Sequence, residues 1–240
     1  MSAPATPANE QLDRLRGLVA SATHQLLGDT ISVTDEQWRA PSRLPEWSRG
    51  HVATHLARQA DAIVRLTEWA KTGVRNDMYA SPQERSEQIE AGSGRSGLDL
   101  QIDLDESAGR LEQAFESLDA AGAWDAEVEM RGGLRVQARL LPLARMLEVA
   151  IHHVDLDVGY EITDLDAPTA EWLLEWCAFR LKHRDEFPQL HLTSDTGFSM
   201  VLGTVGEPIE VSGTSPDLLG WVMGRTSAVT GADGLRLPGF

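Results

Sequence analysis

Residues 44–57 read LPEWSRGHVATHLA, and a helical pattern of apolar residues continues from this stretch as far as Gly73. Ser48 is a favourable N-cap residue, and glycine is a typical helix stop. The apolar positions at helical spacing are Val52, Leu56, Ile63, Leu66 and Trp69. Two histidines, His51 and His55, lie four residues apart in the same stretch. The sequence therefore predicts an amphipathic helix that carries paired imidazoles near its apolar face.

Apolar residues at helical spacing also predict helices over about 9–28, 98–118 and 142–158. In the helix over 98–118, Leu98 and Ile102 belong to the apolar series and are expected to face inward. Amphipathic helices bury their apolar faces by packing against one another. Long helices within about 160 residues therefore favour an antiparallel four-helix bundle.

Two connections in this part of the chain differ from ordinary turns. Residues 74–96 are rich in Gly, Ser, Pro and Asn, so we expect a long polar loop, a kind of segment that is often functional. Alternating apolar residues on either side of a glycine pair predict a short β-hairpin over 128–136.

The C-terminal third has a different pattern, in which a helix over about 167–184 precedes short β-type runs. These runs are LHLTS at 190–194, FSMVLG at 198–203 and IEVSG at 209–213. Ser215 and Pro216 suit the start of a last helix. The predicted fold class is therefore α+β, with a helical bundle over 1–162 and a small α+β domain over 163–240.

The composition argues against several classes of function. The chain has 240 residues, with 21 Lys+Arg against 37 Asp+Glu and a net charge of −16, which disfavours a nucleic-acid partner. Its single cysteine cannot form an internal disulfide or a zinc site made of several thiolates. No apolar run approaches the roughly 18 residues of a membrane span. No export signal is visible at the N terminus, so we expect a soluble cytoplasmic protein.

Two short motifs contain the residues with the most distinctive chemistry. HVATH places His51 and His55 four residues apart, and EVAIH places Glu148 and His152 at the same spacing. Side chains at this spacing lie on one helix face, about 6 Å apart. Two imidazoles and a carboxylate from facing helices could bind one divalent cation with positions left open, as in catalytic sites. Such pairs also occur by chance on helices that bind nothing.

Four stretches carry a resemblance to known families. The run at 44–57 is similar to the DinB-like metal-binding bundle superfamily. MYASPQERSEQI at 78–89, EVAIHHVDL at 148–156 and SGTSPDLLGWVMGR at 212–225 resemble mycothiol-dependent maleylpyruvate isomerases, in order over nearly the whole chain. The resemblance implies a DinB-like bundle followed by a sterol-carrier-like domain that covers the active site. It also implies the conversion of maleylpyruvate to fumarylpyruvate in the catabolism of aromatic compounds.

Carried over to this sequence, the resemblance implies the zinc ligands His55, Glu148 and His152. It also implies that Arg85 and Arg225 are catalytic and bind the substrate or the cofactor. This role is physically reasonable because the substrate is a dicarboxylate, and a guanidinium can pair with a carboxylate through two parallel hydrogen bonds.

Asp155 and His51 are candidates for supporting the ligands. Asp155 follows His152 by three residues and could accept a hydrogen bond from the ring N–H that faces away from the metal. A solvated aspartate near a helix end is the alternative. His51 could give similar support, although the family does not use it as a ligand. His153 points away from His152 on the helix, so we expect it to pack elsewhere.

The implied reaction requires a thiol. Rotation about a carbon–carbon double bond needs transient single-bond character, which a soft nucleophile supplies by adding and then leaving. The chain's only thiol, Cys177, lies in an apolar helix and is expected to be buried and unreactive. The resemblance supplies mycothiol instead, which an open zinc site would keep as a thiolate. The expected partners are a dicarboxylate substrate and a low-molecular-weight thiol, and the chain is expected to be a monomer or weak oligomer.

Three other functions fit parts of the same pattern. A mycothiol S-transferase would use the same metal and thiol to conjugate electrophiles, with no elimination step. A non-catalytic protein would bind only a metal or a small acid. A metal-dependent hydrolase would place water at the open site and would need no thiol.

Overall fold

The computed structural model describes residues 7–181, 187–235 and 237. The chain divides into two compact units, Met1–Gly159 and Tyr160–Phe240, here called the N-terminal and C-terminal units. The N-terminal unit contains helices α1 (Pro7–Thr30), α2 (Asp35–Arg39), α3 (Arg49–Thr72), α4 (Pro82–Ser93), α5 (Gly97–Ala120) and α6 (Leu141–Leu156), strands β1 (Glu127–Glu129) and β2 (Arg135–Gln137), and the 3-10 helix η1 (Ala138–Leu140). None of the helices in the described ranges has the length and apolarity that crossing a membrane requires.

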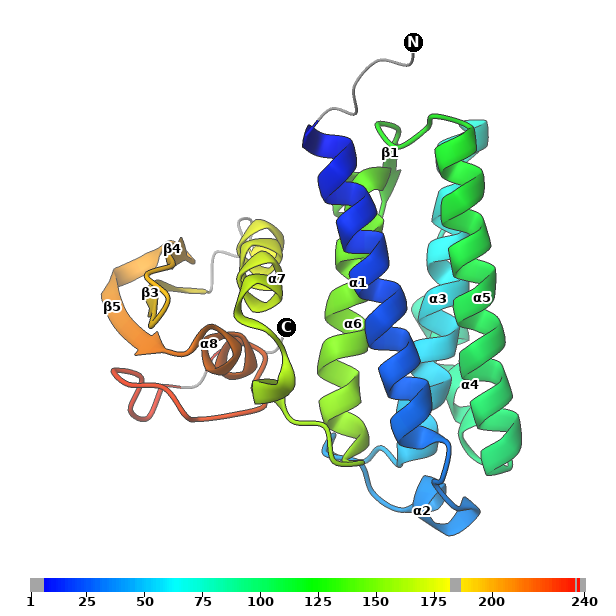
Figure 1. The fold of residues 1–240 in the computed structure, drawn as a ribbon, viewed down its shortest axis with the longest axis horizontal. Helices are drawn as coiled ribbons and strands as arrows, with labels where there is room; N and C mark the ends of the chain where they lie inside the picture. Colours follow the sequence, from blue (N-terminus) through cyan, green and yellow to red (C-terminus); the bar gives the residue numbers. More distant parts are fainter. Residues whose placement is uncertain (1–6, 182–186, 236, 238–240) are drawn as a thin grey trace. The chain divides into compact units, whose positions relative to one another are not determined.

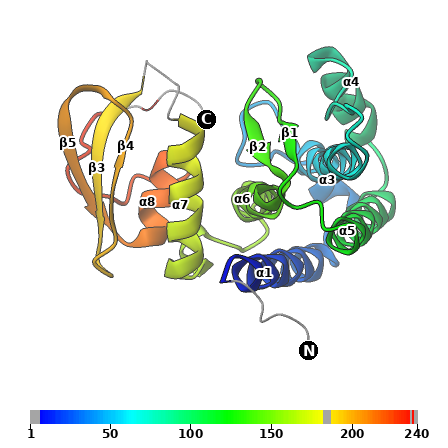
Figure 2. The same cartoon turned by 90° about the horizontal axis from the view of Figure 1, so that it is seen from above.

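The long helices α1, α3, α5 and α6 form the expected bundle (Figure 1), which Figure 2 views nearly end-on, but not all of its neighbouring helices are antiparallel as expected. Helix α3 runs antiparallel to α6, because Arg49 near the start of α3 bonds Asp157 just after the end of α6. Helices α3 and α5 run in the same direction, as the ion pairs of Arg58 with Asp103 and of Asp61 with Arg110 show. The connection through α4 returns the chain to the start of α3 before α5 begins.

Helix α4 corrects the expectation of a loop over 74–96. The Ser81 hydroxyl accepts a hydrogen bond from a backbone N–H of the first turn, and Pro82 occupies the start of the helix. Within this described helix the buried residues are Ile89, Gly92 and Ser93. So few buried positions leave no apolar series for a periodicity argument to detect. As a consequence, Arg85 lies on a helix rather than in a loop.

The contact between α3 and α4 depends on two glycines. A Cβ atom on Gly50 would lie 2.2 Å from the carbonyl oxygen of Ser93, and a Cβ atom on Gly92 would lie 2.4 Å from the Thr54 methyl carbon. Glycine at both positions therefore allows α4 to pack directly on the part of α3 that leads to His55.

Helix α5 exists as expected, and it buries Leu104, Leu111, Phe115 and Leu118 of the expected apolar series, but Leu98 and Ile102 at its start do not face inward as expected. Leu100, Leu104 and Leu111 are buried, whereas Leu98 is 69% exposed and Ile102 is 43% exposed. At the start of the helix, Leu98 and Ile102 as well as Leu100 and Leu104 lie four residues apart, so periodicity alone cannot choose between these two pairs. The packing of α5 on α3 decides which face is inside.

The expected hairpin is confirmed, since Val128 of β1 pairs with Val136 of β2.

The C-terminal unit contains η2 (Ile162–Asp164), α7 (Ala167–Leu181), β3 (Pro188–Ser194), β4 (Ser199–Leu202), β5 (Val205–Gly213) and α8 (Ser215–Val222). Its sheet has the order β4-β3-β5, with β3 antiparallel to β4 and parallel to β5. Thr214, rather than Ser215, caps α8, because the buried Ser215 hydroxyl bonds Glu171 instead. The helix expected over about 167–184 corresponds to α7, and its expected end at 184 lies outside the described residues. Overall, the α+β fold class is confirmed.

Candidate metal centre

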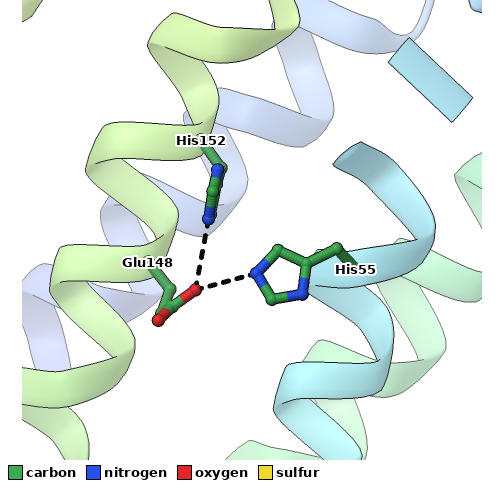
Figure 3. Close-up of side chains that lie close together, drawn as sticks. All are labelled: His55, Glu148 and His152. Atoms are coloured by element: carbon green, nitrogen blue, oxygen red, sulfur yellow. Dashed lines mark hydrogen bonds and ion pairs between the residues drawn. The ribbon is translucent and has the colours of Figure 1, made fainter. Parts of the chain in front are cut away.

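The three expected metal ligands meet between α3 and α6 (Figure 3). Glu148 Oε2 lies 3.0 Å from His55 Nε2 and 3.3 Å from His152 Nε2. One ligand atom from each of the three residues lies within 4.8 Å of the others. His55 is buried, whereas the Glu148 side chain is 26% exposed, so a ligand can reach the cluster from solvent. Two imidazole nitrogens and a carboxylate oxygen at this separation could hold one divalent cation.

The helices that carry these ligands are tied together beside the cluster by Arg49. Its Nε donates to the carbonyl oxygen of Leu156 at 2.6 Å, and its Nη2 donates to the carboxylate of Asp157 at 2.9 Å. A cation at the C-terminal end of a helix is favourable because the last carbonyl groups carry partial negative charge. Arg49 therefore fixes the end of α6 against the start of α3, six residues before His55.

Arg145 makes a second tie on the other side of the cluster. Its Nη1 donates to the carbonyl oxygen of Leu56 at 2.8 Å and to Gln59 Oε1 at 2.6 Å. Leu56 directly follows His55, and Arg145 precedes Glu148 by three residues. The buried guanidinium therefore links the two helical turns that present the ligands.

Asp155 bonds a ligand, whereas His51 has a different environment. Asp155 Oδ2 lies 2.8 Å from Nδ1 of His152, an arrangement that leaves Nε2 of that ring directed toward Glu148. The His51 ring accepts a hydrogen bond from the Ser48 N–H at 3.2 Å and thereby caps α3. Among the described residues, no hydrogen bond joins His51 to the three ligands.

The two arginines that were expected in the site lie in different units. Arg85 of α4 places Nη2 3.1 Å from His55 Nδ1 and lies over the ring of Tyr79. Arg225 follows α8 in the C-terminal unit, where its Nη1 donates to the Met223 carbonyl oxygen. The structure therefore brings Arg85 to the cluster, and it describes Arg225 within its own unit. His153 packs elsewhere as expected, since it is buried and pairs with Asp29 of α1 at 3.1 Å.

Comparison with known proteins identifies the family. A family model described as the mycothiol maleylpyruvate isomerase N-terminal domain matches residues 19–157. The chain belongs to this mycothiol maleylpyruvate isomerase family. A crystal structure of the mycothiol-dependent maleylpyruvate isomerase superposes with a TM-score of 0.88 at 25% identity, and the match covers 98% of this chain and 100% of that one. A mutant of that isomerase matches over the same extent with a TM-score of 0.87. No curated protein sequence matches significantly.

The charge states in this member of the family suit a cation site. Burial, followed by the nearby His152, lowers the pKa of His55 to about 4 despite a hydrogen bond to Glu148. Burial alone would raise the pKa of Glu148, but hydrogen bonds from His152 and His55 outweigh burial and lower this pKa well below its usual value. Burial opposes a charge on His152, yet its hydrogen bonds to Asp155 and Glu148 raise its pKa. At neutral pH the cluster therefore offers a carboxylate and a neutral His55 imidazole.

Two residues beside the cluster were not identified from the sequence. Arg145 lies three residues before Glu148, so helical spacing could have placed it on the ligand face of α6. Trp47 packs edge-on against His55, with ring centroids 5.6 Å apart, and also stacks on His51. No sequence signal indicates this contact, because Trp47 precedes α3 and its direction depends on the chain's path into the helix.

Proposed function

We propose that this protein is a zinc- and mycothiol-dependent isomerase that converts maleylpyruvate to fumarylpyruvate. The observation that supports it most strongly is the open His55–Glu148–His152 cluster, in a chain that matches a mycothiol-dependent maleylpyruvate isomerase over 98% of its length. The donor set fits zinc, because two imidazoles and a carboxylate with a free coordination position are typical of catalytic zinc sites. A zinc ion held by these residues would lower the pKa of a coordinated thiol and favour its thiolate near neutral pH.

The chain's own residues prepare the site for this chemistry. Asp155 holds the His152 ring with Nε2 facing the cluster, and Arg49 and Arg145 hold the two helices in register. Arg85 supplies a positive charge beside His55, where it can pair with a substrate carboxylate and stabilise the negative charge that develops on the substrate. We propose that Arg225 binds the second carboxylate of the substrate and that the C-terminal unit covers the site, as the family resemblance implies.

The nucleophile comes from a separate thiol, because the thiol of the chain is unsuitable. Cys177 is fully buried in the C-terminal unit, and burial raises its pKa to about 12. A buried thiol with so high a pKa contains almost no thiolate at neutral pH. This environment supports the proposed use of mycothiol.

An assay of the metal-loaded protein with maleylpyruvate, with and without mycothiol, tests the proposal. We expect fumarylpyruvate to form only when the thiol is present. A stable thiol adduct in place of fumarylpyruvate would identify an S-transferase. Hydrolysis of maleylpyruvate without any thiol would identify a hydrolase. No reaction with or without thiol would indicate a protein that only binds a metal or a small acid.

A further inference from the structure

A hollow of about 240 Å³ lies between α1 and α5. Its walls include Val19, Leu27, Leu111 and Phe115, and the side chain of Arg145 from α6 lines it as well. Asp13, Asp105 and Glu112 also border the hollow, but all three are exposed, whereas Arg145 is only 2% exposed. The hollow thus combines apolar walls with a cation in the bundle interior, and it contains none of the candidate metal ligands.

Arg145 retains hydrogen-bonding capacity at this position. A guanidinium carries five N–H donors. The N–H groups of Nη1 donate to the carbonyl oxygen of Leu56 and to Gln59 Oε1. Among the described residues, Arg145 forms no ion pair, and no acceptor bonds its Nε or Nη2. These two nitrogens form the edge of the guanidinium that pairs side-on with a carboxylate. Burial lowers the pKa of Arg145 to about 10, although the nearby Glu148, Tyr79 and Asp61 partly oppose this shift without bonding the guanidinium.

Two glycines that line the hollow help to keep it open. Gly17 lies within α1 and Gly109 lies within α5, positions where glycine is less favourable for a helix than alanine. A Cβ atom on either residue would meet no other atom within 4 Å, so close helix packing does not require glycine here. Larger side chains at these positions could instead occupy the hollow.

We propose that this hollow binds a small organic carboxylate with an apolar body, which pairs with the free edge of Arg145. The apolar walls suit an aromatic ring or a short hydrocarbon chain, and the volume is below that of pockets for drug-sized ligands, about 300–1,000 Å³. The site is separate from the metal centre and needs neither metal nor thiol. Its occupant neutralises the buried charge that the protein leaves unpaired.

Fluorine NMR with 4-fluorobenzoate tests the site in the full-length, metal-loaded protein. We expect saturable binding with a dissociation constant of about 1 mM or below. The neutral analogue 4-fluorobenzamide should bind at least about tenfold more weakly, because it cannot form the charged pair with Arg145. Equal binding of the two compounds, or no binding of benzoate, would overturn the proposal.

Substitutions in the hollow distinguish this site from the metal centre. Gly17→Leu and Gly109→Leu should each weaken benzoate binding at least about tenfold while helix propensity keeps the fold stable. Gly28→Leu is the matched control, because Gly28 is an exposed glycine of α1 that has equal space and does not line the hollow. His152→Ala should leave benzoate binding intact. Loss of binding in His152→Ala, or unchanged binding in both glycine variants, would contradict the assignment.

Discussion

Glu148 is the residue around which the metal centre is arranged. Its Oε2 atom lies within hydrogen-bonding distance of His55 at 3.0 Å, and it also pairs with His152 at 3.3 Å. The two histidines differ, because burial lowers the pKa of His55 to about 4, whereas Asp155 raises the pKa of His152. The orientation and proton affinity of His152 therefore depend on a residue that is not itself a metal ligand.

Replacing Asp155 with asparagine should weaken zinc binding about 10–100-fold, because partners that orient a ligating histidine typically have effects of this size. Competition with a chromophoric chelator measures the affinity. Asp157→Asn is the control, since Asp157 lies at the same helix end but pairs with Arg49 rather than with a ligand. Equal affinity of Asp155→Asn and the parent protein would show that the hydrogen bond does not support the metal.

The pH dependence of zinc binding also tests the role of Asp155. A ligating histidine must be unprotonated, and the pKa of His152 is raised in the metal-free protein. Zinc affinity should therefore fall, by up to about tenfold per pH unit, as the pH drops below this raised pKa. In Asp155→Asn the decline should begin at a lower pH, because the hydrogen bond from the His152 ring to a carboxylate is gone.

Arg85→Ala should lower kcat/KM for maleylpyruvate at least about 100-fold, because it removes a fixed cation from the site. Zinc should still bind, since His55, Glu148 and His152 all remain in the variant. Arg75→Ala is the matched control, because Arg75 precedes α4 in the same connection and is exposed. Steady-state kinetics of both variants measure kcat/KM. If Arg85→Ala retained full activity on this dicarboxylate, the proposed role would be wrong.

At the scale of the elements, α4 carries Arg85 to the metal centre, and the close α3–α4 contact sets its position. Gly50 allows that contact, because a Cβ atom there would lie 2.2 Å from a backbone oxygen of Ser93. A backbone atom cannot move aside as a flexible side chain can. The site therefore depends on how these two helices pack as well as on the ligands themselves.

Gly50→Ala should separate α3 from α4 and reduce the free energy of unfolding by about 1–3 kcal/mol, the usual effect of overpacking. Denaturant unfolding measures this change. Gly94→Ala is the control, because a Cβ atom on Gly94 would contact nothing within 4 Å. Equal stability of the two variants would show that the close contact can relax without a penalty.

The sequence predicts some elements better than others for identifiable physical reasons. The apolar series of α3 and the spacing of Glu148 and His152 are local signals, and both pointed to the three residues that the structure brings together as a candidate metal site. Helix α4 depends on a cap at Ser81 rather than on a buried face, so periodicity gives no indication of it. Whether Leu98 or Leu100 is buried at the start of α5 depends on contacts with α3, which the α5 sequence alone does not encode.

For the molecule as a whole, the bundle contains the candidate metal ligands and Arg85, while the C-terminal unit contains Arg225 and the buried Cys177. The sequence predicted the two parts from their different patterns. It did not reveal the parallel run of α3 and α5 or the hollow beside Arg145, because both depend on packing between segments distant in the sequence.

The proposed function requires an external thiol to act catalytically at the candidate metal centre. The most direct test counts molecules of fumarylpyruvate formed per molecule of mycothiol when the thiol is limiting and the protein is loaded with zinc. We expect at least about 100 products per thiol, because elimination returns the nucleophile after each turnover, and no product with His152→Ala. A yield that stops at one product per thiol, or that is the same without thiol, would contradict the catalytic role of the thiol.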